Sequence, residues 1–157
     1  MRWHRRGRGE CPQAWMVEVG MAEGKLLLEI VTPQGLVFSE EVEEVTATGS
    51  EGEFGVLPGH VRFVTTLKIG MLTCKTANQM KIFFVSWAYC GVGPERMLVL
   101  ADSAERSEEI DVERARAAMK RAEERLKKAE EIDFKRAETA LERAVTRIQL
   151  AELKRSK

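Results

Sequence analysis

The C-terminal third of this 157-residue chain carries four arginines that could bind an anion. Arg121 and Arg125 are four residues apart, as are Arg143 and Arg147, so each pair shares one side of a helix. If two such helices fold back on each other, the guanidinium groups converge on an anion such as a nucleotide phosphate. Asp111 would then accept hydrogen bonds from a ribose or a base edge. The alternative is a solvated charged face laced with Glu–Arg pairs, and the pattern alone leaves both readings open.

A glycine-rich segment over residues 49–60, Gly-Ser-Glu-Gly-Glu-Phe-Gly-Val-Leu-Pro-Gly-His, is a second candidate site. It lacks the Gly-Lys-[Ser/Thr] ending of a phosphate-binding loop, and Glu51 and Glu53 would repel phosphate. The segment is either a long β-connection with tight turns or an acidic, exposed contact loop for a protein partner.

The sequence shows no catalytic constellation. His4 and His60 are the only histidines, and neither has a neighbouring Ser, Cys or Asp pattern that indicates a nucleophile or a metal site. Cys11, Cys74 and Cys90 are odd in number and have no C-x-x-C spacing, which argues against a disulfide framework and a zinc site. We therefore expect a protein that is not an enzyme and has no metal and no required cofactor.

The charge balance excludes two classes of partner. Lys plus Arg and Asp plus Glu number 25 each, so the whole chain has no electrostatic attraction to nucleic acid or to an anionic membrane. No apolar run approaches the roughly 20 residues that cross a bilayer, so any membrane association must come through a protein partner. With 44% hydrophobic residues the chain can still bury a core.

The elements that would position these residues fall into three parts. Residues 1–24 start with a basic stretch and show no sustained periodicity; we expect a disordered or non-native extension, with Met21 as a candidate initiator. Residues 25–107 show short β-branched and aromatic runs between Gly, Pro and Asn turns, typical of a sandwich or barrel. The expected strands are Leu26–Val31, Leu36–Ser39, Val42–Thr48, Val61–Leu67, Met71–Thr76, Met80–Ser86, Trp87–Val92 and Arg96–Leu100.

Residues 108–157 are the third part, and they predict two helices. Asp111 is placed to cap the first and Asp133 the second, with a turn near residues 130–132. The two segments repeat each other, since Ile-Asp-Val-Glu-Arg-Ala at 110–115 returns as Ile-Asp-Phe-Lys-Arg-Ala at 132–137. Their inner stripes are rich in Ala, which lets the helices approach closely but buries little area. Such a hairpin is only marginally stable alone and suits a switch.

Several of these motifs together resemble a known family. Residues 28–35, 49–60 and 100–106 resemble bacterial F-type ATP synthase epsilon subunits in order and spacing, and residues 110–115 look like that family's Ile/Leu-Asp-x-x-Arg-Ala nucleotide motif. The resemblance covers roughly residues 26–154. It implies an N-terminal flattened β-sandwich followed by a C-terminal antiparallel two-helix hairpin.

The resemblance also implies a function and partners. The chain would be a non-catalytic central-stalk rotor subunit that couples proton-driven rotation to ATP synthesis. Its head would bind the gamma subunit and the ring of membrane rotor subunits, and its helices would extend into the alpha/beta catalytic head to inhibit ATP hydrolysis. It would lie peripherally on the cytoplasmic face of the bacterial inner membrane, with no direct membrane insertion and no nucleic acid.

Two sets of site residues follow from the resemblance. Glu51, Glu53 and His60 would face the ring. Regulatory ATP would bind the folded hairpin at the positions that match the family's motif, namely Glu105, Ile110, Asp111, Arg114, Ala115, Arg121, Arg143 and Arg147. Residues 87–90, Trp-Ala-Tyr-Cys, depart from the Gly-Gly-Phe-like start common in relatives, and Gly91 stands where Glu is common, which changes local contacts with gamma.

A competing class is an unrelated adaptor or chaperone that acts purely by protein–protein interaction through a β-sandwich and a helical hairpin. Composition and periodicity allow it equally well. The segment over residues 49–60 favours the epsilon family, because a generic adaptor has no need of that run followed by an Asp-capped Ala/Arg repeat.

Overall fold

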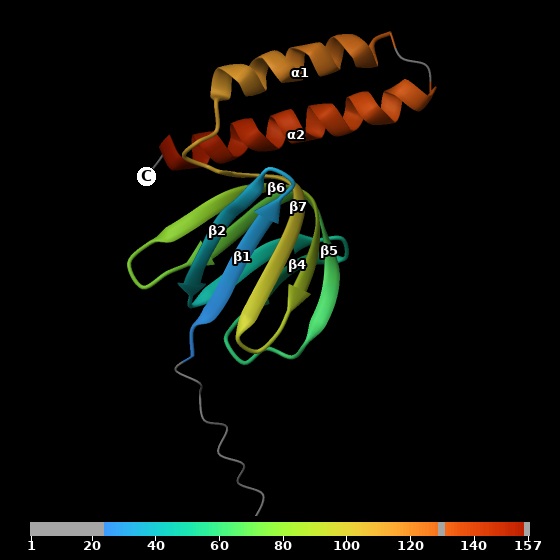
Figure 1. Cartoon of the computed structure of the whole chain (residues 1–157). Coiled ribbons are helices and arrows are strands. Elements are labelled where there is room, and N and C mark those ends of the chain that lie inside the picture. Colours follow the sequence, from blue (N-terminus) through green and yellow to red (C-terminus); the bar gives the residue numbers. More distant parts are fainter. Residues whose placement is uncertain (1–23, 129–130, 156–157) are drawn as a thin grey trace, which may run out of the picture.

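The computed structural model describes residues 24–128 and 131–155, and they form seven strands followed by two helices (Figure 1). The proposed N-terminal extension therefore lies almost entirely outside the described residues. The strands are β1 (Leu26–Thr32), β2 (Gly35–Val42), β3 (Glu44–Gly49), β4 (Gly52–Val56), β5 (Phe63–Lys75), β6 (Met80–Val92) and β7 (Arg96–Arg106). The helices are α1 (Val112–Leu126) and α2 (Glu131–Arg155).

The strands make one continuous hydrogen-bonded sheet in the order β2-β1-β7-β6-β5-β3-β4. All neighbouring pairs are antiparallel except β1 and β7, which run parallel with Leu27 opposite Arg96 and Val31 opposite Leu100. The sheet folds over on itself and encloses one apolar core, which includes Leu28, Leu72 and Phe83. The predicted flattened sandwich followed by an antiparallel two-helix hairpin is confirmed.

The sheet folds over at a corner that β5, β6 and β7 share. Before the corner of β6 the core residues are Phe83 and Val85, and after it they are Ala88, Cys90 and Val92, so the inward-facing parity changes. The same change separates Leu67 from Leu72 on β5 and Ala101 from Ala104 on β7. We define the corner by residues 68–70, 86–87 and 102–103. It divides the outer surface into two separate faces.

Two residues show how the backbone turns at the corner. Trp87 has φ 44°, the only positive φ of a non-glycine residue in the described chain. Gly70 lies against β3, where a Cβ atom would come within 3.0 Å of the Thr48 Cβ atom. The sequence-based division of β5 at residues 67–71 and of β6 at residues 86–87 into separate strands was wrong, because each strand bends there without ending.

Two other sequence-based boundaries were also wrong. The segment over residues 49–60 contains a strand, β4, which pairs with β3 and buries Val56. Helix α2 begins at Glu131, so Asp133 lies inside the helix and cannot cap it, since an N-cap needs non-helical backbone. Of the predicted turn near residues 130–132, Glu131 and Ile132 are helical, and Glu130 lies outside the described residues.

The hairpin docks on the head through α2, which lies between α1 and the sheet (Figure 1). Leu150 and Ala151 of α2 are buried against Ile69 and Phe84 on the outer side of β5 and β6, and Ile110 completes this second apolar cluster. We call these five residues the docking cluster. Because it is far smaller than the core of the head, the docked position depends on few contacts.

Candidate functional site

A pocket of about 310 Å³ lies where the two helices meet the end of β7. This volume is near the lower end of the range for small-molecule sites. Both helices and the segment that joins α1 to the head contribute side chains to it. Its lining residues are Glu105, Glu109, Asp111, Arg114, Ala115, Ala118, Arg121, Ala140, Arg143, Ala144 and Arg147.

Seven of the eight residues that the family motif pointed to line this pocket. The exception is Ile110, which the structure places in the docking cluster. Sequence reasoning missed Glu109, Ala118, Ala140 and Ala144. The three alanines were visible in the predicted Ala stripes, but a stripe of small residues did not indicate that it would also form the wall of a pocket.

Local sequence explains how α1 enters the pocket. Asp111 has extended backbone, with φ −78° and ψ 102°, and its Oδ1 atom accepts a hydrogen bond from the Arg114 backbone N–H at 3.0 Å. The predicted cap at Asp111 is therefore confirmed. Ala115, Ala122 and Ala144 are buried between the helices, so the small side chains bring the two helix axes close together. The Asp111 cap and the alanines between the helices fix the positions on α1 from which the Arg114 and Arg121 side chains extend.

Arg147 has the most extensive contacts of the four pocket arginines. Its Nε and Nη2 atoms donate to Glu105 Oε1 at 3.0 and 2.8 Å, and Nη2 also donates to Ser103 Oγ at 3.3 Å. Its guanidinium stands over the Phe84 ring, 4.1 Å from the centroid. All three partners belong to the head, so Arg147 joins α2 to β6 and β7.

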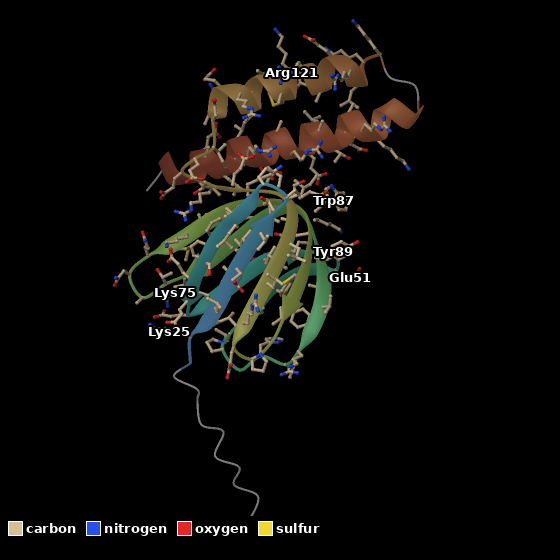
Figure 2. The ribbon with its side chains drawn as sticks, in the orientation of Figure 1. Lys25, Glu51, Lys75, Trp87, Tyr89 and Arg121 are labelled. Carbon is tan, nitrogen blue, oxygen red and sulfur yellow. The ribbon has the colours of Figure 1, made fainter. Side chains whose placement is uncertain are left out.

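The other three pocket arginines are differently placed. Within the described part of the chain, no ion pair involves Arg114, Arg121 or Arg143. Figure 2 shows Arg121 on α1, the helix further from the sheet. Three guanidinium groups without a carboxylate partner suit phosphate oxygens, because this planar donor binds them with two parallel hydrogen bonds. Glu109 and the free oxygen of Asp111 add acceptors for hydroxyl groups. The residues present therefore fit a nucleotide such as ATP.

The second predicted set, Glu51, Glu53 and His60, is not gathered into one cluster. Glu51 lies at the turn between β3 and β4, Glu53 on β4, and His60 in the loop beyond the end of β4. At about 3.3 Å per residue, the five residues of β4 separate Glu51 from that loop by about 17 Å. His60 instead stacks near Phe63, with ring centroids 5.2 Å apart.

An apolar patch covers the outer side of the sheet on the far side of the corner from the docked hairpin. Leu36, Val31, Leu100 and Tyr89 follow one another in register across β2, β1, β7 and β6, and Val64 stands on β5. Tyr89 is 68% exposed and Val64 79%. We call these five residues the uncovered face. The alternation of inward and outward side chains along each strand was visible in the sequence. Which half of each strand α2 leaves uncovered depends on the position of the corner, and the sequence did not show that position.

Neither buried thiol belongs to a candidate site. Burial raises the pKa of Cys74 to about 11 and that of Cys90 to about 12, so both are protonated at neutral pH. Residues 24–128 and 131–155 contain no group of three or more His, Cys, Asp or Glu side chains arranged to hold a metal ion. Over the same residues, no helix is both long enough and apolar enough to cross a bilayer.

Two family models match successive parts of the chain. The ATP synthase delta/epsilon chain β-sandwich domain matches residues 25–107, and the long α-helix domain of the same chain matches residues 108–152. The ATP synthase epsilon chain of Thermodesulfovibrio yellowstonii is 58% identical over 106 residues, covering 68% of this chain and 76% of that protein. That of Geotalea uraniireducens is 55% identical over 108 residues, covering 69% and 78%.

A solved structure agrees with these sequence matches. The fold is similar to a chain in the cryo-EM structure of the Euglena gracilis mitochondrial ATP synthase, OSCP/F1/c-ring, with a TM-score of 0.71 and 25% identity over 83% of this chain and 82% of that one. The family models together span the head and the hairpin, and the two relatives are more than half identical to this chain. Both findings point to the same family. The chain belongs to the ATP synthase epsilon chain family, whose members are non-catalytic accessory subunits of the central stalk.

Proposed function

We propose that the docked hairpin of this subunit binds ATP in the pocket, and that the undocked hairpin extends into the alpha/beta catalytic head and blocks ATP hydrolysis. The observation that carries the proposal is the composition of the pocket wall, which takes residues from α1, from α2 and from the end of β7. A ligand held by all three can bind only while the hairpin is docked. It therefore shifts the hairpin towards the docked state by its differential affinity.

The inhibitory part is tested by ATP hydrolysis of a cognate catalytic head depleted of this subunit. Adding the full-length chain should lower the rate, and adding a version that ends at Ser107 should not. If both forms bind the catalytic head and neither lowers the rate of ATP hydrolysis, the subunit couples rotation without inhibiting hydrolysis, and the regulatory proposal fails.

The ATP part is tested on the isolated full-length chain by calorimetric titration, where no catalytic subunit competes for the nucleotide. The change Arg143→Gln removes an unpaired pocket guanidinium and should weaken ATP binding at least tenfold, because a charge-assisted hydrogen bond contributes about 1.5–3 kcal/mol. Arg116→Gln, an arginine on α1 outside the pocket, is the matched control. Equal affinities for both variants would contradict the assignment.

We further propose that the uncovered face is the surface for the gamma subunit. Apolar residues lie in register across four strands, and all of them are exposed except the half-buried Val31. They form a patch of the kind that marks a protein interface, and the docked hairpin leaves it free. Trp87, 49% exposed, extends this patch to the corner; Figure 2 shows it near α2, above Tyr89.

The β3–β4 turn and the loop that follows β4 are proposed to meet the ring of membrane rotor subunits. Glu51 and Glu53 offer exposed carboxylates, and Leu57 and Val61 in the loop offer exposed apolar side chains. Through these contacts the subunit would lie peripherally on the cytoplasmic face of the bacterial inner membrane. Replacing Glu51 and Glu53 together by Gln should weaken binding of the head to purified rings and reduce its salt dependence. Unchanged binding and unchanged salt dependence would remove both carboxylates from the interface.

A further inference from the structure

Arg147 differs from the other pocket arginines because its side chain is bound to the head. Its three polar contacts run to Glu105 and Ser103 on β7, and its guanidinium covers Phe84 on β6. The other three arginines line the same pocket with no ion pair among the described residues. Resemblance to the family treats all four alike, whereas the contacts divide them into two groups.

Position on α2 links Arg147 to docking. Leu150 and Ala151 lie three and four residues further on, so they share one side of the helix with Arg147, and both are buried in the docking cluster. Phe84 belongs to that cluster and is also the ring beneath the guanidinium. The ion pair thus continues the apolar contact of α2 with the head by one helical turn.

The surroundings make this pair stronger than an ordinary surface pair. The Arg147 side chain is 21% exposed and that of Glu105 36%, so solvent screens the charges only in part. Two donor atoms of one guanidinium meet the same carboxylate oxygen, and the aromatic face below gives a further attraction to the cation. An incoming phosphate would have to break these contacts before it could use Arg147.

We infer that Arg147 is a docking latch and not a phosphate ligand: together with Glu105 it fastens α2 to the head without nucleotide, and phosphate falls to Arg114, Arg121 and Arg143. The inference deepens the proposed regulation, and only its nucleotide arm rests on that proposal. It separates two tasks within one pocket. The latch sets how often the hairpin is docked, and the unpaired arginines set how strongly ATP adds to docking. Arg147 is therefore a positioning residue.

The test measures docking in the full-length chain without nucleotide. Ala151 is 8% exposed in the docking cluster, so the thiol introduced by Ala151→Cys, in a background with Cys11→Ser, reacts with N-ethylmaleimide when α2 lifts. Cys74 and Cys90 are buried in the head and are counted separately by mass spectrometry. Amide hydrogen exchange of residues 148–153 in the unmodified chain gives the same information without a new side chain.

Arg147→Gln and Glu105→Gln should each speed alkylation about tenfold, the effect of losing one charge-assisted contact. The double variant should react no faster than Arg147→Gln alone, because Arg147→Gln already removes the ion pair with Glu105. The exchanged pair Glu105→Arg with Arg147→Glu should react more slowly than Arg147→Glu alone, because the ion pair returns although the contact of a cation with Phe84 is lost. Arg116→Gln, which changes α1 outside the pocket, should leave the nucleotide-free rate unchanged.

Two results would overturn the inference. If Arg147→Gln leaves nucleotide-free alkylation and amide exchange unchanged, Arg147 does not hold the hairpin. If the exchanged pair reacts as fast as Arg147→Glu alone, the charges of Arg147 and Glu105 do not act on each other. Failure of the ATP proposal has a different signature: added ATP would then slow alkylation in no variant, while the nucleotide-free comparison would still decide the role of Arg147.

Discussion

At the scale of single residues, Trp87 occupies the least favourable backbone conformation in the described head. A left-handed φ brings Cβ close to the following carbonyl oxygen, which costs an L-residue about 1–2 kcal/mol. The sheet needs this conformation because β6 changes its inward parity at the corner. A bulky residue that persists in such a position is worth examining for a task of its own, and the indole lies at the edge of the proposed gamma surface.

Comparing two substitutions isolates the strain at Trp87. Trp87→Ala and Trp87→Gly both remove the indole, but only glycine relieves the left-handed backbone. We expect Trp87→Gly to be more stable than Trp87→Ala by about 1 kcal/mol in urea unfolding. In an ordinary strand the order is reversed by about 0.5–1 kcal/mol, so a less stable glycine variant would show that the corner carries no strain.

The two buried thiols predict a loss of stability at alkaline pH. Both thiol pKa values are raised in the folded head, from 9.0 to about 11 for Cys74 and about 12 for Cys90. The unfolded chain therefore releases these protons first, and the free energy of unfolding falls as pH rises from about 9 towards those values. Urea unfolding between pH 8 and 10 should show a shallower decline for Cys74→Ala with Cys90→Ala than for the natural chain. Equal slopes would contradict the assignment.

At the scale of elements, the hairpin is a marginal structure held by the Asp111 cap, the alanines between its helices, the docking cluster and the Arg147–Glu105 ion pair. None of these alone contributes much free energy, since alanine buries little area and the docking cluster has only five members. Such weak contacts suit the proposed function, in which the hairpin occupies two positions. The same property makes each contact easy to test.

Asp111 has two roles that one pair of variants separates. Asn caps a helix about as well as Asp, whereas Ala does not. Asp111→Ala should therefore destabilise α1 by about 1 kcal/mol, seen as faster amide exchange at Arg114 and Ala115, and Asp111→Asn should not. If Asp111→Asn nevertheless weakens ATP binding, the carboxylate acts on the ligand in addition to the cap. Equal exchange in all three proteins would show that the cap contributes nothing.

The strand-rich head and the hairpin could be predicted from local patterns, and the resemblance to the family supplied most of the pocket residues. The Asp111 cap depends only on neighbouring residues and could therefore be predicted, whereas Arg125, which was paired with Arg121 by spacing alone, does not line the pocket. The pairing of Arg147 with Glu105 could not be predicted, because it depends on where α2 docks. Strand β4 was hidden by glycines and glutamates whose alternate neighbours, Phe54 and Val56, face the core. The corner was mistaken for strand ends, since a bend and an end use the same residue types.

At the scale of the whole molecule, the corner gives the head two outer faces with different tasks. One face, with Ile69 and Phe84, holds the hairpin, and the other, with Tyr89 and Leu100, stays bare. The relatives are named as ATP synthase epsilon chains, and the adaptor or chaperone alternative has no support among them. Under the proposed function, gamma binds the bare face while the hairpin docks on the other face or leaves it.

The bare face predicts a specific effect on assembly. Tyr89→Arg places a charge in the centre of the uncovered face and should weaken binding to a cognate alpha/beta/gamma complex at least tenfold, with little change in stability, since the side chain is already exposed. Met80→Arg is the matched control, an exposed apolar residue at the β5–β6 turn outside this face. Similar binding of both variants, measured by surface plasmon resonance, would move the gamma contact elsewhere.

The parallel pairing of β1 with β7 also fixes an order of events during folding. Leu27 and Arg96 lie at opposite ends of the head's sequence, so β1 gains its second neighbour only after nearly all of the head has been synthesised. Closing so long a loop is entropically costly and slow, whereas two adjacent helices form through local contacts within microseconds. The platform for α2, formed by Ile69 and Phe84, exists only once the sheet has closed. In a full-length chain that refolds from denaturant, the marginal hairpin therefore has no platform until the sheet has closed, and docking of α2 is the last step.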